Sequence, residues 1–417
     1  MRRREFLAAS ALGATMLPLR RAFAEDLVPP TGRKFLFVVN NGGWDPTRVF
    51  ATEFGNPNVD MERDAEEAEL GDLRFVDHAD RPAVRTFFES WGDRSLILNG
   101  VLVPSVAHEN CMRLSMTGST RQDGSDWPAI IGGSRGSAFA LPHVVASGPS
   151  YPGQFGAFVT RTGTSGQLPG LLDGEILDWS DLPVSAPGSR AEEAMDRYLE
   201  RRIRGWNAGA TGVDVAAGEA YLTAHARASS LKSLRTLVDW SSSSSFTDQV
   251  DFALDVLSLG VSRCVTVAFS HNSWDSHKDN DRYQGENFQE LFTALHGLVG
   301  RLRALPGEAG GTLADETVLV VLSEMGRTPQ LNATDGKDHW PYTSVLMVGS
   351  GFTGGRVVGG LDDFYYGRSV DVATAEIDDR AGQSLSSDVV GATLLALAGV
   401  DNEEHLPGVA RLDGVLV

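Results

Sequence analysis

Residues 34–39, KFLFVV, form a continuous apolar run that leads directly into Asn40-Asn41-Gly42-Gly43. A short run of this kind, closed by a glycine turn, is typical of a buried strand that feeds a loop. Four similar runs follow, at residues 95–98 (SLIL), 264–269 (CVTVAF), 317–322 (TVLVVL) and 344–348 (SVLMV). Polar or glycine-rich turns flank each of them, so we expect five buried strands.

Helical stretches separate these predicted strands, at residues 191–206, 215–238, 246–259 and 287–305. The last of them carries its apolar residues on one stripe, as a helix that packs on a core does. Fully apolar strands that alternate with helices predict an α/β fold, with a mostly parallel sheet sandwiched between helices. Glycine- and serine-rich stretches at 130–137, 147–170 and 241–245 predict loops.

Composition sets broader limits. A chain of 417 residues that is 42% hydrophobic and 22% charged is typical of a globular protein with one large domain or two. Its 55 acidic and 36 basic residues give a net charge of −19, which argues against nucleic acid as a partner. Cys111 and Cys264 are too few for a disulfide-built scaffold, and the sequence leaves open whether they pair.

The N-terminal segment has the features of an export signal. Arg3-Arg4 precede Phe6-Leu7 and an apolar, alanine-rich run, which ends at the small-residue site Ala22-Phe23-Ala24. The run is too short and too weakly hydrophobic for a membrane-spanning helix. We therefore expect a twin-arginine signal peptide over residues 1–24, the twin-arginine translocase as a transient partner, and a periplasmic or extracellular protein with no stable membrane span.

Polar residues that could carry chemistry lie next to the predicted strands. Parallel sheets bind ligands beyond the carboxyl ends of their strands, so these are the positions where a site is expected. They are Asp45 after the first strand, Ser105 and His108 after the second, Asp275 and His277 after the third, Glu324 and Arg327 after the fourth, and Asp338, His339 and Trp340 before the fifth.

Mixed Asp and His sets suit zinc, manganese or iron, because loops at strand ends can bring their oxygen and nitrogen atoms to one point. Alternatives stay open for each residue. Asp275 and His277 fit a surface loop as well as a metal site. His108 could cap a helix start, and Glu324 with Arg327 could form a buried ion pair. His143, His225, His296 and His405 are expected to be structural.

These motifs together resemble one family. The N-terminal signal, the strand with its Gly-Gly loop, the Trp-Asp-x-His element, EMGRTP at 324–329, and DHW at 338–340 followed by a strand resemble the bacterial domain-of-unknown-function family 1501. That family is exported by the twin-arginine pathway and belongs to the alkaline-phosphatase/sulfatase-like superfamily. The resemblance runs from about residue 34 to the end of the chain, and the closing helix at 387–400 also fits it. It implies one alkaline-phosphatase-like α/β domain over residues 25–417, with a loop-rich and helical insertion around 150–246.

The resemblance also implies roles for individual residues. Divalent metal ions (zinc, manganese, calcium or iron) would be bound by Asp45, Asp275, His277, Asp338 and His339. Ser105, which we expect to be an N-cap where phosphate is favoured, is the candidate nucleophile, with Thr117, Ser119 and Thr120 as alternatives. Arg327 would steady the non-bridging oxygens as a second catalytic group, and His108, Glu324 and Trp340 would contact the substrate.

Two functions compete at this stage. The resemblance and the Asp/His set favour an exported metal-dependent hydrolase or transferase that acts on a phosphate or sulfate ester, with a small molecule or a glycan carrying the ester group. The glycine-rich loops, and a nucleophile position that shows no clear sequence signature, favour a non-catalytic binding or assembly protein. Such a protein would keep the fold with a degenerate site. A dinucleotide-dependent oxidoreductase is disfavoured, because Gly42-Gly43 lacks the third glycine of that motif.

Overall fold

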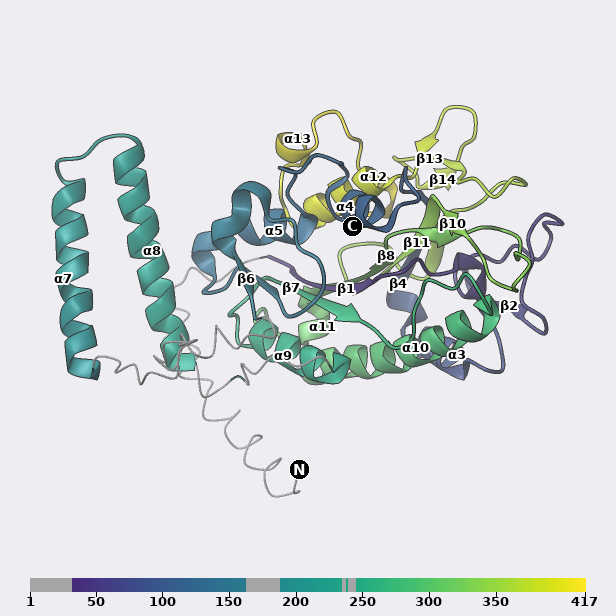
Figure 1. Ribbon diagram of the computed structural model, residues 1–417, viewed down its shortest axis with the longest axis horizontal. Helices are drawn as coiled ribbons and strands as arrows, with labels where there is room; N and C mark the ends of the chain where they lie inside the picture. Colours follow the sequence, from purple (N-terminus) through teal and green to yellow (C-terminus); the bar gives the residue numbers. More distant parts are fainter. Residues whose placement is uncertain (1–31, 163–187, 235–237, 239–244) are drawn as a thin grey trace, which may run out of the picture.

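The computed structural model describes residues 32–162, 188–234, 238 and 245–417. The predicted signal peptide over residues 1–24 and serines 241–244 of the serine run lie outside the described residues. The fold is built on an eight-stranded sheet, shown edge-on in Figure 1. In spatial order its strands are β12 (Arg356–Gly359), β4 (Ser95–Leu102), β11 (Tyr342–Val348), β8 (Thr317–Ser323), β1 (Lys34–Asn40), β7 (Cys264–Phe269), β5 (His143–Val145) and β6 (Val159–Arg161).

Seven of these eight strands run in one direction. β1 pairs in parallel with both β7 and β8, and the parallel pairing continues through β5 to β6. β11 is antiparallel to its neighbours β8 and β4, while β12 is again parallel to β4. The predicted mostly parallel sheet is therefore confirmed.

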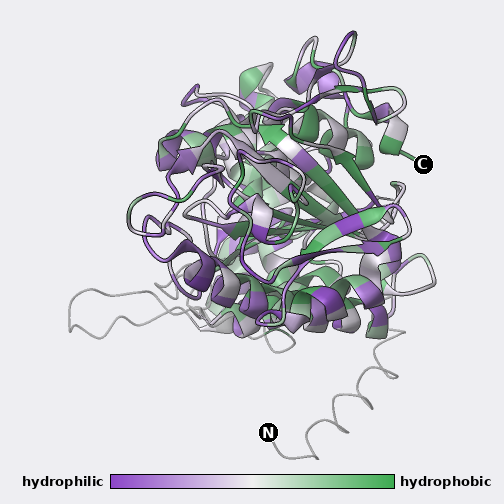
Figure 2. Cartoon of the chain, turned by 90° about the vertical axis from the view of Figure 1, so that its right-hand side faces the viewer, coloured by the Kyte–Doolittle hydropathy of each residue, from purple (hydrophilic) through white to green (hydrophobic). Residues whose placement is uncertain are grey.

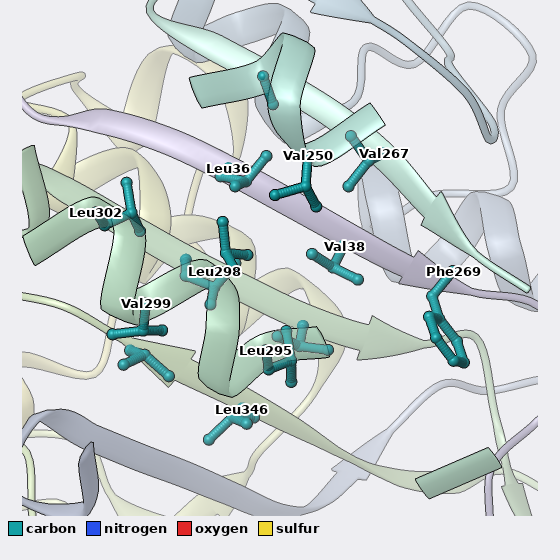
Figure 3. Close-up of a cluster of buried hydrophobic side chains, with 14 of the residues drawn as sticks. Leu36, Val38, Val250, Val267, Phe269, Leu295, Leu298, Val299, Leu302 and Leu346 are labelled. Carbon is teal, nitrogen blue, oxygen red and sulfur yellow. The ribbon is translucent and has the colours of Figure 1, made fainter. Parts of the chain in front are cut away.

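The two faces of the sheet bury separate hydrophobic cores. On β1, Leu36 and Val38 point into one core, while Phe35, Phe37 and Val39 point into the other. The first core lies under α3 (Pro82–Trp91), α9 (Phe246–Ser258), α10 (Asn280–Ala304) and α11 (Leu313–Glu316), and Figure 3 shows part of it. The second lies under α4 (His108–Thr117), α5 (Trp127–Gly133) and α12 (Ser387–Leu397), near the short α13 (Asn402–His405). The sheet is thus sandwiched between helices, as predicted.

Hydropathy follows this layering. In Figure 2 the strands are mostly hydrophobic, whereas the outer helices alternate between hydrophobic and hydrophilic residues. Burial of a side chain such as Leu295 or Leu298, both almost fully covered, contributes about 1.5–3 kcal/mol each. The apolar stripe of α10 therefore anchors the longest helix to the sheet.

The predicted elements agree closely with those of the structure, with informative differences. α10 begins at Asn280, seven residues before its predicted start, because its first two turns are polar and carry no apolar stripe. Asn280 and Gln284 are nonetheless fully buried, since their amides bond to the loops at the sheet edge. The short strands β5, β6 and β12 were missed, since three or four residues give no clear period.

Smaller elements decorate this core. They are the hairpin β2 (Glu66–Leu70) and β3 (Leu73–Asp77), the pair β9 (Gly326–Arg327) and β10 (His339–Trp340), and the small sheet β13 (Ser369–Asp371), β14 (Glu376–Ile377) and β15 (Gln383–Ser384). Two long helices, α7 (Ser189–Asn207) and α8 (Val213–Leu234), form an antiparallel hairpin that stands out from the body on the left of Figure 1. They lie in the predicted insertion, but β6, from the same region, belongs to the main sheet.

Both cysteines are free and buried. Cys264 lies on β7 in one of the two cores, and Cys111 lies on α4 in a small separate cluster. Burial raises the pKa of the Cys264 thiol to about 12, so it stays protonated. Within the part of the chain that the structure describes, no helix combines the length and the apolar composition that crossing a membrane requires.

Candidate metal centre

The loops that carry the predicted site residues meet at one edge of the sheet. β1, β7 and β8 are parallel neighbours, so the loops that follow them, with Gly42, Asp275 and Glu324, leave the sheet at the same edge. α4, which begins with His108, follows β4, which runs in the same direction. β11 runs the opposite way, so its amino end lies at this edge and brings His339 there.

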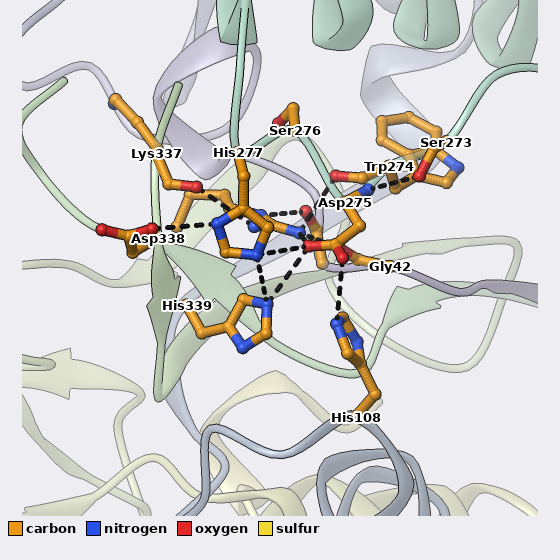
Figure 4. A network of polar contacts seen from close by, with 12 residues as sticks. Gly42, His108, Ser273, Trp274, Asp275, Ser276, His277, Lys337, Asp338 and His339 are labelled. Atoms are coloured by element: carbon orange, nitrogen blue, oxygen red, sulfur yellow. Dashed lines mark hydrogen bonds and ion pairs between the residues drawn. The ribbon is translucent and has the colours of Figure 1, made fainter. Parts of the chain in front are cut away.

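Asp275 is the centre of a cluster of three imidazoles (Figure 4). Its Oδ1 lies 3.1 Å from Nε2 of His277 and 3.1 Å from Nε2 of His339. Its Oδ2 lies 3.6 Å from Nε2 of His108. The Nε2 atoms of His277 and His339 are themselves 3.1 Å apart. One ligand atom each from His108, Asp275 and His339 lie within 4.8 Å of one another, which is close enough to hold one metal ion.

The second ring nitrogen of each imidazole faces an oxygen. The three contacts are His108 Nδ1 to Glu324 Oε1 (2.7 Å), His277 Nδ1 to Asp338 Oδ1 (2.9 Å) and His339 Nδ1 to the carbonyl oxygen of Val106 (2.8 Å). A carbonyl oxygen or an ionised carboxylate only accepts, so each Nδ1 carries the proton and donates it. In a neutral imidazole the lone pair is then on Nε2.

Three Nε2 lone pairs therefore face the Asp275 carboxylate, two of them at Oδ1 and the third at Oδ2. Acceptor atoms at such distances repel one another unless a cation or a proton lies between them. Histidine ligands of metals commonly donate their other N–H to a carboxylate or a backbone carbonyl, which is the arrangement found for all three rings. The residues present thus fit a bound divalent metal ion.

The charges around the cluster support the same interpretation. Partial burial would raise the pKa of Asp275, but the guanidinium of Arg327, 2.7 Å away, outweighs it and lowers that pKa to about 2. Asp275 is therefore ionised at neutral pH. The hydrogen bond to Glu324 raises the pKa of His108 above its usual value, so the cluster favours added positive charge at this position.

Arg327 is fully buried and its donors are already in use. Its Nε donates to the carbonyl oxygen of Gly43 at 2.8 Å, and Nη1 donates to that of Lys337 at 3.1 Å. Nη2 contacts the carbonyl oxygens of Gly42 and Trp274 as well as Asp275. All three nitrogens of this buried side chain thus already contact protein oxygens, and its predicted role in steadying substrate oxygens remains a prediction. Arg327 ties three loops together behind the cluster.

Glu324 is also fully buried, in contrast to its predicted contact with substrate. Its Oε1 accepts from the backbone N–H of Gly42 at 2.8 Å and faces His108, and its Oε2 accepts from Gly43 N and Ser323 Oγ at 3.2 and 2.9 Å. Four contacts thus fix the carboxylate that orients His108. Glu324 thus has the buried structural role that the sequence left open, but its partner is the imidazole of His108 and not Arg327.

Asp45 does not join the cluster. Its carboxylate is fully buried and contacts Lys337 Nζ and Asn280 Nδ2, each at 2.9 Å, Thr47 Oγ1 at 2.6 Å and Arg48 Nη1 at 3.6 Å. Burial alone would raise the pKa of Asp45, but Lys337 and Arg48 outweigh it and hold that pKa well below its usual range. Every acceptor position of this carboxylate is matched by a donor, so the arrangement leaves none for a metal ion.

Comparison with known proteins matches part of the chain to one family. A family model described as "Protein of unknown function (DUF1501)" matches residues 222–407. The family prediction is confirmed for that region. The DUF1501 region contains Asp275, His277, Asp338 and His339, whereas His108, the third imidazole in contact with Asp275, comes from outside it. No curated protein matches the sequence.

Solved structures with a similar arrangement include a member of the alkaline phosphatase superfamily. One is a protein of that superfamily from Vibrio parahaemolyticus, with 10% identity over 92% of this chain and 69% of that chain, at a TM-score of 0.37. Another is the C-terminal periplasmic domain of EcEptC from Escherichia coli in complex with Zn, with 8% identity, 92% and 87% coverage and a TM-score of 0.40. A third is Ps i-CgsB in complex with k-i-k-neocarrahexaose, with 8% identity, 92% and 75% coverage and a TM-score of 0.39.

Ser105 is not the N-cap of a helix, which corrects that prediction. α4 starts at His108 with Ala107 as its N-cap, and the Ser105 hydroxyl accepts from the Ala107 backbone N–H at 3.2 Å. A serine that bonds two residues ahead closes its own small turn, which delays the helix start. Ser105 is half-buried and lies one residue before Val106, whose carbonyl oxygen holds His339.

Trp340 and Asp338 flank the cluster. Trp340 is half-buried, donates its indole N–H to the carbonyl oxygen of Tyr365 at 2.8 Å and stacks on Tyr366 at a ring distance of 5.6 Å. The Asp338 carboxylate contacts Nδ1 of the His277 ring. It therefore orients His277, a candidate metal ligand, and does not face the Nε2 atoms near Asp275. Their predicted roles in substrate and metal binding remain predictions.

Sequence reasoning missed Lys337, Asn280 and Gln284, which together connect the loops of Asp45 and Asp275. The Gln284 amide donates to the carbonyl oxygen of Trp274 at 2.9 Å and accepts from the backbone N–H of Asp45 at 2.9 Å. The only signal for Lys337 was its position directly before Asp338-His339. His108 was expected to contact substrate, and only its approach to Asp275 in space reveals it as a ligand candidate.

Proposed function

We propose that His108, Asp275, His277 and His339 bind one divalent metal ion, and that the protein is an exported metal-dependent hydrolase or transferase that acts on a phosphate or sulfate ester. The convergence of three Nε2 lone pairs on the Asp275 carboxylate is the observation that carries this proposal. The EMGRTP and DHW motifs, which resemble those of the alkaline-phosphatase/sulfatase-like superfamily, support the reaction class.

The donor set narrows the identity of the ion. Three imidazole nitrogens and one carboxylate suit zinc, iron or manganese. Calcium prefers sites made only of oxygen atoms, so it fits these residues poorly. When bound, the ion would polarise an ester oxygen and lower the pKa of a nucleophile.

The chain's own residues would position the reaction. Glu324, Asp338 and the Val106 carbonyl fix the ring orientation of the three histidines. The side chains of Asp275 and His277 remain 37% and 44% exposed, so an ester group can reach the cluster from solvent. Ser105 remains the candidate nucleophile, because its loop also supplies the carbonyl that holds His339.

Export is part of this proposal. Arg3-Arg4, the apolar run and the Ala22-Phe23-Ala24 site support the twin-arginine route. Changing both arginines to lysine is expected to leave uncleaved precursor in the cytoplasm. Normal processing of that variant would exclude this route.

A binding or assembly protein with the same fold is the second candidate. It is favoured by one observation: Asp45 and Arg327, two groups expected in the chemistry, are committed to buried internal contacts. A binding protein would hold the ion without turning over a substrate.

Activity measurements separate the two candidates. Metal-reconstituted protein is assayed with generic phosphomonoester, phosphodiester and sulfate-ester substrates, alongside Asp275→Asn and Ser105→Ala. Ser119→Ala, which changes a serine that was only an alternative nucleophile, is the matched control. We expect turnover that both test variants lose and the control keeps. Turnover that survives Asp275→Asn would exclude the proposed site, and bound metal without turnover would favour the binding protein.

A further inference from the structure

The α7–α8 hairpin exposes an unusual share of large apolar side chains. Among the described residues, twelve large hydrophobic side chains are exposed, and five of them lie on this hairpin. Met195, Tyr198 and Trp206 on α7 are 55%, 53% and 52% exposed, and Val213 at the start of α8 is 85% exposed. Single exposed apolar residues are ordinary, but four within one short segment indicate a contact surface.

Helical spacing places three of these side chains on one stripe. Met195, Tyr198 and Trp206 are separated by three and eight residues, which brings them to the same side of α7. Leu199 and Ile203, which are half-buried, lie next to this stripe, on the side toward α8. α7 therefore has one apolar side that packs within the hairpin and a second that is uncovered.

The same segment is basic, although the chain is acidic. Residues 195–213 contain four arginines against one aspartate and one glutamate, whereas the whole chain has a net charge of −19. Arg201 and Arg202 are exposed beside the stripe, whereas Arg204, which is also exposed, lies on the opposite side of α7. We name Met195, Tyr198, Arg201, Arg202, Trp206 and Val213 the hairpin patch.

The position of the hairpin patch suits a flat partner. α7 is the leftmost helix of Figure 1, with α8 between it and the main body, and the turn between the two helices lies at the top left. Trp206 and Val213 flank this turn on either side. A plane can therefore lie along the outer side of α7 without meeting the acidic body of the protein.

We propose that the hairpin patch docks the protein on the surface of an anionic phospholipid bilayer. Tryptophan and tyrosine are enriched at the membrane interface, where a ring can be half in hydrocarbon and half in water. Arginine forks bind phosphate headgroups and are attracted by the negative surface potential. A strongly amphipathic, arginine-rich helix with low overall hydrophobicity is the type that lies on a bilayer without crossing it.

Charge favours this occupant over a second copy of the chain. Two copies would bring basic stripes together, and each copy carries a net charge of −19. An anionic bilayer, in contrast, complements the hairpin patch while it repels the rest of the protein. The protein would therefore stand on its hairpin, with the main body held off the surface.

Vesicle flotation tests this proposal on the full chain, so that any contribution of residues 1–24 is common to all variants. Vesicles contain equal amounts of phosphatidylglycerol and phosphatidylcholine, or phosphatidylcholine alone. The test variant is Trp206→Ser/Arg201→Gln/Arg202→Gln. The matched control, Phe364→Ser/Arg380→Gln, removes an exposed aromatic ring and an exposed arginine far along the chain from the hairpin.

We expect binding to anionic vesicles that weakens with added salt and falls at least about tenfold in the test variant, because each arginine near the surface and the buried ring all contribute. The control should bind as the wild type does. As a second measurement, brominated lipids should quench part of the tryptophan fluorescence, and Trp206→Phe should remove that part.

Three results would overturn the proposal. They are equal vesicle binding by the test and control variants, no binding to anionic vesicles at all, and a wild-type dimer that the test variant converts to monomer. The last would assign the hairpin patch to a second copy of the chain. None of these results bears on metal binding or turnover, so this proposal and the proposed function fail independently.

Discussion

Two Trp-Asp pairs follow two neighbouring strands, and their aspartates meet opposite surroundings. Trp44-Asp45 follows β1, and Trp274-Asp275 follows β7. Both tryptophans are buried and their rings pack edge to face at 6.3 Å. Asp45 is completely enclosed by donors, whereas Asp275 is partly exposed and faces three imidazoles whose lone pairs also point at it.

The comparison shows what separates a structural carboxylate from a ligand candidate. Position after a strand and sequence context are the same for both. The difference lies in the balance of donors and acceptors, which is set by side chains far away in the chain: Lys337 and Asn280 for Asp45, and His108 and His339 for Asp275. A carboxylate whose neighbours are all donors needs no ion, whereas Asp275, which has the donor Arg327 but also faces three imidazole nitrogens, leaves room for one.

The largest effect is expected where the donors of Asp45 are removed. Lys337→Met takes away the buried ammonium 2.9 Å from the carboxylate and leaves only the more distant guanidinium of Arg48, at 3.6 Å, to offset the buried charge, which costs up to about 3–5 kcal/mol of unfolding free energy. Denaturant titration measures this loss. Lys278→Met, at an exposed lysine of the adjacent loop, is the control and should change stability little. Equal stability of the two variants would show that Asp45 does not need its donor.

The next effect concerns the support of the cluster. Glu324→Gln keeps the shape of the side chain but removes the negative charge that holds His108 Nδ1–H. We expect metal affinity, measured by competition with a chelator, to fall about 10–100-fold. Glu109→Gln, on the exposed neighbour of His108 in α4, should leave it unchanged. Unaltered affinity in Glu324→Gln would remove His108 from the ligand set.

His143 extends the comparison to the histidines. It is fully buried on β5, its Nε2 lies 2.9 Å from Thr266 Oγ1, and burial lowers its pKa to about 3. Because the unfolded chain binds a proton near pH 6.5 and the folded chain does not, this group's contribution is present above pH 6.5 and is lost as pH falls toward 3. At pH 5.5 the loss is about 1.4 kcal/mol.

The variant His143→Gln should lack this acid sensitivity between pH 7.5 and 5.5, as measured by denaturant titration at each pH. Its metal content should match that of the wild type, because His143 belongs to the sheet core and not to the cluster. An unchanged pH slope would mean that His143 is accessible to protons in the folded state.

Much of the fold could be predicted from the sequence, because it follows from local patterns. The run 264–269 coincides with β7, and the other predicted strands lie within one to four residues of their ends in the structure. The direction of β11 could not be predicted, since an apolar run has no polarity. That reversal matters, because it brings His339 to the edge where the other loops end.

The candidate site could be predicted only in part. Asp275, His277 and His339 were predicted to be neighbours in space, and they are. The prediction needed only the position of each loop next to a strand end, which can be read from the sequence. The position of a residue next to a strand end could not exclude Asp45, nor reveal that Glu324 and Arg327 face inward. Those conclusions depend on which hydrogen-bond partners surround each side chain, and hence on where Lys337, Gly42 and Gly43 lie in the folded chain.

The metal content of Asp275→Asn and Asp45→Asn, two matched changes of one carboxylate to an amide, tests the central claim most directly. Both variants and the wild type are loaded with zinc, desalted and measured by mass spectrometry of the metal. The account predicts about one ion per chain in the wild type and in Asp45→Asn, and a large loss in Asp275→Asn. A wild type that retains no ion, or an equal loss in the two variants, would contradict it.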